Sequence, residues 1–370
     1  MKRHTALLLL LSLFASPGPA MAQQAWLLLH GTEQAGIYRA QNGEMRQVAQ
    51  VGDIVVYGET ASSLAVISQR TPADKVLLQV IDKKSQRVTA TWPLQGYPTP
   101  QLSGPSRDVA LTDRFAYYVA LRYGEDGKTL VPNELGGHFD FYRVSLADGK
   151  FDRFPLSYEC ANPRVIVWND SPLVYSWNGY GVWRFDPGQR ALQPLVLRRD
   201  IDDTIVASDA SNLAATEPTS FADYVALPGV GVFRTSRLGS LNQILDPTLA
   251  RKAIPGASVH LGAKGGDVIR TFPAAYESKP AIGALTKRDG ELRYAVINPA
   301  SMKVVRELVV PEQAVLDSVT ISRTGSVAYV DRRELAVRRI TEEGSETLLP
   351  LKGQVAPAYA DYTRIISLDP

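Results

Sequence analysis

The sequence has few of the residues and motifs that usually identify a disulfide, a metal site or a catalytic site. Its 370 residues contain one cysteine, Cys160, which excludes an internal disulfide. It has no paired cysteines and no H-E-x-x-H, so no short-range zinc pattern is present. G-x-S-x-G and a lysine-containing phosphate loop are missing as well. We expect Cys160 to be a small buried apolar side chain; an intermolecular disulfide or a reactive thiol is the alternative.

An excess of charge is also lacking. The chain has 40 basic and 38 acidic side chains, and two of the basic ones, Lys2 and Arg3, lie in an N-terminal segment that we expect to be removed. This leaves 38 of each sign (40 − 2 = 38). A neutral chain has no polybasic footprint, so we predict no nucleic-acid partner. No apolar run after that segment approaches 18 residues, so we predict no membrane insertion.

The N-terminus has the order of a secretory signal peptide. Met1–His4 carries positive charge, Ala6–Ala15 is apolar, and Ala20-Met21-Ala22 provides a small-residue cleavage site. The apolar run is too short for a stable anchor, and no cysteine follows it for lipid attachment. We therefore expect residues 1–22 to be a signal peptide, residues 23–370 to form one domain, and the protein to be periplasmic or secreted.

A short pattern of two apolar or aromatic residues followed by arginine recurs along the chain. Its copies end at Arg39, Arg143, Arg184, Arg234 and Arg338, and 104-residue gaps separate the first pair and the last pair. Two copies without the arginine fill these gaps at Leu77–Asp82 and Arg293–Asn298. Seven repeats of about 50 residues, each with several strands, predict an all-β fold, a seven-bladed β-propeller. We expect the arginine to serve packing between blades, and the aromatic residue before it to fill the gap between them.

The two ends of the chain complement each other. The first repeat offers only three strands, while one β-branched strand, Tyr362–Leu368, remains at the C-terminus. We predict that this last strand completes the first blade and closes the ring, which removes open sheet edges. In the fifth blade we expect the strands Thr204–Ala207, Tyr224–Leu227, Val230–Thr235 and Asn242–Leu245.

Long loops concentrate on one predicted face of the propeller, which we call the loop-rich face. It receives the connections between blades and those between second and third strands, among them Gln95–Arg107, Arg122–His138, Arg198–Asp203, Asp246–Gly266 and Lys352–Asp361. Ser208–Asp223 and Phe272–Lys279 fall on the opposite face in this assignment. Because long loops in compact domains usually carry function, we place binding on the loop-rich face. The candidate ligand-binding residues there are His30, Glu33, Tyr97, Arg107, Glu134, His138, Asp200, Asp203 and His260.

No metal, cofactor or catalytic residue can be assigned from these loops. We expect His30, His138 and His260 to be solvated loop residues; a metal site formed by all three in the central channel is the alternative. The acidic run Asp200–Asp203 could bind calcium or form a solvated turn, and it does not fit the spacing of an EF-hand.

Two hairpins carry a resemblance to a known group of proteins. They are Val80-Ile81-Asp82 with Val88–Thr91, and Val296-Ile297-Asn298 with Val304–Leu308. These resemble hairpins of exported bacterial propellers of the YVTN-repeat and amine-dehydrogenase heavy-subunit type. The resemblance covers the blades and implies the fold, but no site residue.

Three functions are compatible with this sequence. The preferred one is an exported scaffold that binds a protein or a small molecule through its loop-rich face. The first alternative is an enzyme, such as a lyase, hydrolase or lactonase, with dispersed residues at the channel mouth. The second is a non-catalytic subunit of an exported redox complex.

Overall fold

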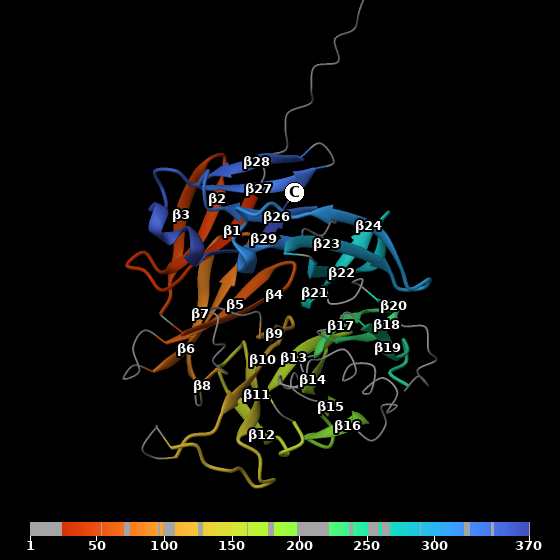
Figure 1. Ribbon diagram of the computed structural model, residues 1–370. Coiled ribbons are helices and arrows are strands. Elements are labelled where there is room, and N and C mark those ends of the chain that lie inside the picture. The colour runs from red at the N-terminus through yellow and green to blue at the C-terminus, as the bar shows by residue number, and fades with distance from the viewer. Residues whose placement is uncertain are drawn as a thin grey trace, which may run out of the picture.

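The protein is a seven-bladed β-propeller, in which seven antiparallel sheets surround a central axis (Figure 1). The computed structural model describes residues 24–52, 54–69, 75–94, 97–98, 108–124, 129–160, 162–176, 181–197, 222–236, 240–250, 259–260, 267–288, 290–321, 326–341 and 344–369. Two short 3-10 helices, η2 (Leu316–Ser318) and η3 (Pro357–Tyr362), lie in the connections before inner strands. No helix in the described part of the chain is long and apolar enough to cross a membrane.

The blades are numbered here in chain order. Blade 1 contains β29 (Thr363–Asp369), β1 (Gln24–Leu29), β2 (Gly36–Gln41) and β3 (Glu44–Gln50). Blade 2 contains β4 (Ile54–Glu59), β5 (Ser63–Gln69), β6 (Val76–Asp82) and β7 (Arg87–Leu94). Blade 3 contains β8 (Tyr97–Pro98) and β9 (Ala110–Leu111), which both pair with β10 (Phe115–Leu121), then β11 (Phe139–Ser145) and β12 (Phe151–Pro155). Blade 4 contains β13 (Pro163–Trp168), β14 (Ser171–Ser176), β15 (Gly181–Asp186) and β16 (Ala191–Leu197).

The remaining blades follow the same order. Blade 5 contains β17 (Ala222–Leu227), β18 (Gly231–Ser236), β19 (Ser240–Leu245) and β20 (Val259–His260). Blade 6 contains β21 (Asp267–Tyr276), β22 (Lys279–Arg288), β23 (Glu291–Asn298) and β24 (Lys303–Val309). Blade 7 contains β25 (Thr320–Ile321), β26 (Val327–Asp331), β27 (Ala336–Thr341) and β28 (Gly344–Pro350).

The predicted closure of the ring is confirmed. The C-terminal strand β29 pairs with β1 in antiparallel register, from Gln24 opposite Asp369 to Leu29 opposite Thr363. Blade 1 therefore joins the first and last described strands of the chain. A tight turn at Asn42-Gly43 joins β2 and β3, and its φ values of 54° and 81° are those that a type I′ hairpin turn requires.

The core lies between the blades. Seven clusters of buried side chains occur among the described residues, one at each blade interface. Because side chains alternate along a strand, Leu27 and Leu29 of β1 face blade 7, whereas Trp26 and Leu28 face blade 2. Strands close to the axis are thus apolar on both sides, which explains the unbroken sequence Trp-Leu-Leu-Leu in β1.

The repeated arginines have different environments. Arg143 lies over the rings of Phe115 and, in the next blade, Phe185, with its Cζ atom 4.9 Å and 5.3 Å from their centroids. This copy confirms the expected packing between blades, while Arg184 is exposed.

In blade 7 the arginine of the repeated pattern lies one position later than the sequence spacing predicts. The register shift between third and fourth strands falls between Ile37 and Tyr38 in blade 1, but between Val337 and Arg338 in blade 7. Arg339, and not Arg338, therefore corresponds to Arg39. Sequence spacing cannot detect this difference, because the shift is a local change in strand pairing.

Blade 5 also departs from the predicted assignment. Its sheet runs β17-β18-β19-β20, so the strand at Ala222–Leu227 comes first among the described strands and not second. The predicted strand Thr204–Ala207 lies outside the described residues. Phe272–Lys279 is not a loop, because β21 and β22 extend through it to a tight turn at Glu277 and Ser278. The aromatic residues Phe272 and Tyr276 favour the continued hairpin, and the turn residues adopt positive φ.

Candidate functional site

Charged residues occur at or just before the start of the inner strand in six successive blades. We call them the axial charge ring, and they alternate in sign around the axis: Asp108, Arg164, Asp223, Arg270, Asp317 and Arg364, from blades 3, 4, 5, 6, 7 and 1. Because connections between blades lie on the loop-rich face, all six are at that end of the inner strands. The residue before β4 in blade 2, Asp53, lies outside the described residues.

The first pair of the ring joins blades 3 and 4. Nε of Arg164 lies 3.8 Å from Oδ1 of Asp108. Burial lowers the pKa of the Arg164 guanidinium, but Asp108 and Asp223 are among the groups that act against it, and the pKa is raised overall. Arg164 therefore stays charged and is balanced by carboxylates on both of its neighbours.

The second pair joins blades 5 and 6. Oδ2 of Asp223 accepts hydrogen bonds from the backbone N–H and the hydroxyl of Thr271, at 2.8 Å and 2.9 Å. Oδ1 of Asp223 accepts a third from the hydroxyl of Tyr175 in blade 4, at 3.3 Å. Next to Thr271, the guanidinium of Arg270 lies over the ring of Phe272 at 5.0 Å. Asp223 thus connects three blades.

The third pair joins blade 7 to the closing strand. Nη2 of Arg364 donates to Oδ2 of Asp317 at 3.1 Å, and Nη1 donates to the backbone oxygens of Asp361 and Thr363. Its Nε is buried without a hydrogen-bond partner. Burial lowers the pKa of Arg364, and the neighbouring Arg270 charge lowers it further. The carboxylates of Asp317 and Asp361 act in the opposite direction and raise the pKa of Arg364.

His30 is the predicted site residue that reaches this sector. It is buried at the end of β1, and its ring meets the edge of the Tyr362 ring at 5.6 Å between centroids. Its Nε2 has no hydrogen-bond partner. Burial, and secondly the Arg364 charge, lower the pKa of His30 to about 4. His30 is therefore a neutral, buried imidazole at pH 7, and not a solvated loop histidine.

Glu134 and His138 lie elsewhere, in the loop between β10 and β11. Glu134 bridges Arg122 and Arg153, at 3.1 Å and 2.6 Å. A backbone hydrogen bond and these two arginines lower the pKa of Glu134 to about 2. The arrangement fixes the loop through satisfied ion pairs, and His138 is exposed beside it.

Three other candidate ligand-binding residues belong to blades 1, 3 and 5. Glu33 is exposed in the turn after His30, Tyr97 belongs to β8, and His260 belongs to β20 of blade 5. Arg107, Asp200 and Asp203 lie outside the described residues. In the described part of the chain no three His, Cys, Asp or Glu side chains gather closely enough to hold a metal ion.

Cys160 behaves as expected from composition. It is buried and unpaired in the cluster between blades 3 and 4. Burial raises the pKa of its thiol well above the usual range, so the thiolate is disfavoured.

The axial charge ring escaped the sequence analysis, although a signal exists. Its members are separated by 56, 59, 47, 47 and 47 residues, close to the blade period. The third-strand arginines form the more conspicuous repeat in the sequence. The ring becomes recognisable only when each charge can be assigned to the start of an inner strand.

No protein-family profile matches this chain, and no curated protein matches it. Solved structures do. A streptogramin B lyase structure superposes with a TM-score of 0.52 at 11% identity, covering 92% of this chain and 90% of that one. A selenomethionine-substituted virginiamycin B lyase from Staphylococcus aureus gives 0.49 at 10% identity, with coverages of 82% and 86%. A functionally unknown protein from Desulfotomaculum acetoxidans DSM 771 gives 0.47 at 13%, with 86% and 93%.

At this identity the likeness shows the fold alone. The first of these structures agrees with the seven-bladed arrangement over nearly the whole chain. The expected relation to YVTN-type and amine-dehydrogenase-type propellers stays a prediction, as do the enzyme and redox-subunit alternatives.

Proposed function

We propose that the protein is an exported binding propeller that takes a carboxylate-bearing ligand at the loop-rich end of its axis, in the sector formed by blades 6, 7 and 1. The observation that carries this proposal is that two polar atoms there, Nε of Arg364 and Nε2 of His30, are buried without hydrogen-bond partners. The charges that act on Arg364 include those of Asp317, Asp361 and Arg270, and the carboxylate of Asp317 is half exposed. Guanidinium groups bind carboxylates with strong, oriented hydrogen bonds.

Two unsatisfied polar atoms support the same site. Nε of Arg364 and Nε2 of His30 are buried without hydrogen-bond partners, and the charge of one residue acts on the other. An unsatisfied buried donor costs about 1–3 kcal/mol, so its retention calls for an explanation. A bound carboxylate, directly or through a water molecule, would supply the missing acceptor.

The structural role of the ring does not compete with this proposal. The Asp108–Arg164 pair and the Asp223 contacts are balanced and hold neighbouring blades together. The carboxylate can come from a small molecule or from the chain terminus of a partner protein, and the recognising chemistry is the same.

Ligand-induced thermal stabilisation tests the proposal. The mature protein is heated with succinate, with glutamate and with a tripeptide ending in a free carboxylate, each compared with its amide. At 100 times Kd a ligand stabilises the folded state by about 2.7 kcal/mol. We expect one or more of the carboxylates, and none of the amides, to raise Tm by several degrees.

Two single substitutions test where the carboxylate binds. Arg270→Met removes one guanidinium from the sector, and we expect it to weaken binding at least tenfold. Arg333→Gln, an exposed arginine on the same face, serves as the matched control and leaves binding unchanged. Equal stabilisation by acids and amides, or unchanged binding in Arg270→Met, contradicts the proposal. So does the absence of stabilisation by all three carboxylates.

A further inference from the structure

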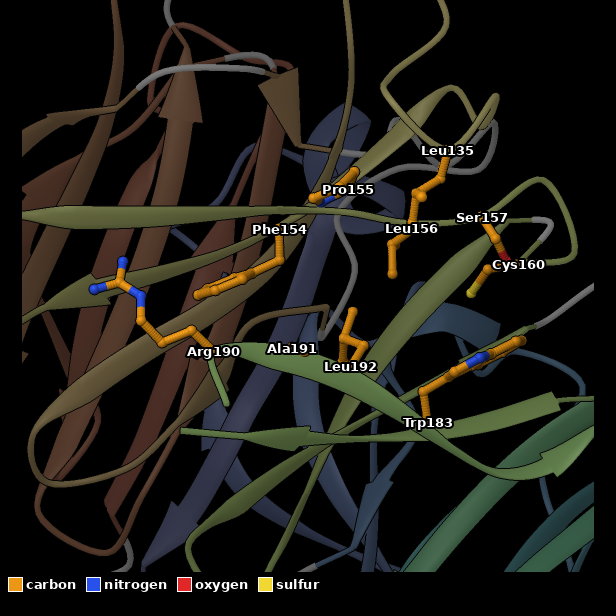
Figure 2. Close-up of a pocket in the computed structure, with 10 residues that line it drawn as sticks. All are labelled: Leu135, Phe154, Pro155, Leu156, Ser157, Cys160, Trp183, Arg190, Ala191 and Leu192. Atoms are coloured by element: carbon orange, nitrogen blue, oxygen red, sulfur yellow. The ribbon is translucent and has the colours of Figure 1, made fainter. Parts of the chain in front are cut away.

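A second concavity lies away from the axis, on the flank between blades 3 and 4. It has a volume of about 330 Å³. Its lining comes from β12, from the connection that follows it, and from β15 and β16, with one residue from the loop after β10 (Figure 2): Leu135, Phe154, Pro155, Leu156, Ser157, Cys160, Trp183, Arg190, Ala191 and Leu192. The volume is at the lower end of the range for small-molecule sites and equals roughly eleven waters of liquid.

The body of this flank pocket is apolar and rigid. Phe154, Leu156 and Cys160 are each no more than 6% exposed, and they belong to the same core cluster as Trp183. The indole of Trp183 packs on Gly181, where an added Cβ would lie 2.2 Å from a ring carbon. The ring can keep this position only because residue 181 has no side chain. A fixed indole wall favours a flat aromatic group.

One end of the pocket carries an unbalanced positive charge. Arg143 of blade 3 donates Nε and Nη2 to Oδ2 of Asp152, at 3.0 Å and 2.5 Å. Arg190 of blade 4 donates Nη2 to Oδ1 of the same carboxylate at 2.5 Å. Two guanidinium groups therefore share one carboxylate, which leaves a net charge of +1. The side chain of Arg190 is 63% exposed, so its remaining N–H groups are accessible.

The charged end and the aromatic end are separate. In Figure 2 Arg190 and Trp183 lie at opposite ends of the lining, with Leu192 between them. The pocket is thus amphipathic along its length. Leu135, which is 53% exposed, borders it on the side of the loop-rich face.

We propose that the flank pocket binds a small aromatic carboxylate, with its ring against Trp183 and its carboxylate at Arg190. The apolar lining provides the binding energy for the ring, and the excess charge selects an anion over a neutral molecule of the same shape. This site is independent of the one at the axis, because it is built from blades 3 and 4 and shares no residue with the sector of blades 6, 7 and 1.

Titration calorimetry with a matched pair of probes tests the proposal. The probes are 3-phenylpropionate and the neutral 3-phenylpropan-1-ol, with the mature protein. We expect the acid to bind about fivefold more tightly, since an exposed charge contact contributes about 1 kcal/mol. Arg190→Gln leaves Asp152 balanced by Arg143 alone, and should make the two probes bind equally. Lys150→Gln, an exposed nearby lysine, is the control and preserves the preference.

Two more variants secure the position of the site. Ser157→Trp fills the pocket from its rim, where the side chain is half-buried, and should abolish binding of both probes. Arg270→Met at the axis should leave both affinities unchanged, which separates this site from the axial one. Equal affinities for acid and alcohol in the unaltered protein overturn the proposal, as does binding that survives Ser157→Trp. A lack of saturable binding by either probe also overturns it.

Discussion

The closing strand β29 should control the stability of the whole ring. Ile365 is packed in the cluster between blades 1 and 7, and Ile366 in the cluster between blades 1 and 2. Both are buried, at 2% and 0% exposure. Each substitution to alanine leaves a cavity and should cost about 2–5 kcal/mol. A closed ring that unfolds as one unit should lose this amount of global stability in either case.

The expected change in melting temperature follows from size. The 348 residues expected to remain after removal of residues 1–22 (370 − 22) have an unfolding entropy of about 0.7 kcal/mol/K, from about 2.1 cal/mol/K per residue. A loss of 2–5 kcal/mol therefore lowers Tm by about 3–7 °C. Differential scanning calorimetry of Ile365→Ala and Ile366→Ala should give one transition in each variant, shifted by this amount.

The control is Val304→Ala on the outer strand β24. Val304 is 42% exposed, so its truncation should shift Tm by less than about 1 °C. The reasoning would be refuted by a transition that splits in two, because the blades next to β29 would then unfold separately. The reasoning would be refuted equally if Ile365→Ala and Ile366→Ala shifted Tm no more than Val304→Ala does.

Two further predictions concern His30 and a close contact between blades. Because the pKa of His30 is lowered from 6.5 to about 4 by folding, its neutral form stabilises the protein fully above pH 6.5, and this contribution is lost as the pH falls toward 4. Denaturant unfolding of the native protein should therefore lose about 3 kcal/mol more over that range than His30→Gln does, and parallel pH profiles would contradict the burial argument. Gly58→Ala should destabilise by about 3 kcal/mol, because the added Cβ would lie 1.8 Å from the backbone oxygen of Val109 in blade 3. Gly188→Ala, on a surface turn with negative φ, is the comparison in the same melting assay, and equal effects of the two substitutions would contradict the prediction.

The repeat made the fold predictable from sequence. Each blade is the same small structure, so the period, the Asn42-Gly43 turn and the spare strand at the C-terminus specify the ring before any contact is known. The failures occurred where repeats differ from one another. In blade 5 the long segment before Ala222 hides which strand is first, and in blade 7 a shift at Val337 displaces the arginine pattern.

The candidate site was less predictable for a different reason. His30 was found because histidine is rare in this chain, but its burial against Tyr362 depends on how β29 returns to blade 1. The partners Arg270, Asp317 and Arg364 come from three blades and look like ordinary strand residues in sequence. The flank pocket depends on Gly181 and Trp183 meeting residues of blade 3, which no local pattern predicts.

The pairing of β1 with β29 has a consequence for biosynthesis. A chain is made from its N-terminus, so β1 is the first of the described strands to emerge, while its partner on the axial side is the last of them. Until then the hydrogen-bonding groups on that edge of β1 have no strand to pair with, and the apolar side chains of Ile365 and Ile366 are absent from two interfaces. Synthesis of β29, and not the appearance of successive blades, is therefore the event that permits the native ring to form.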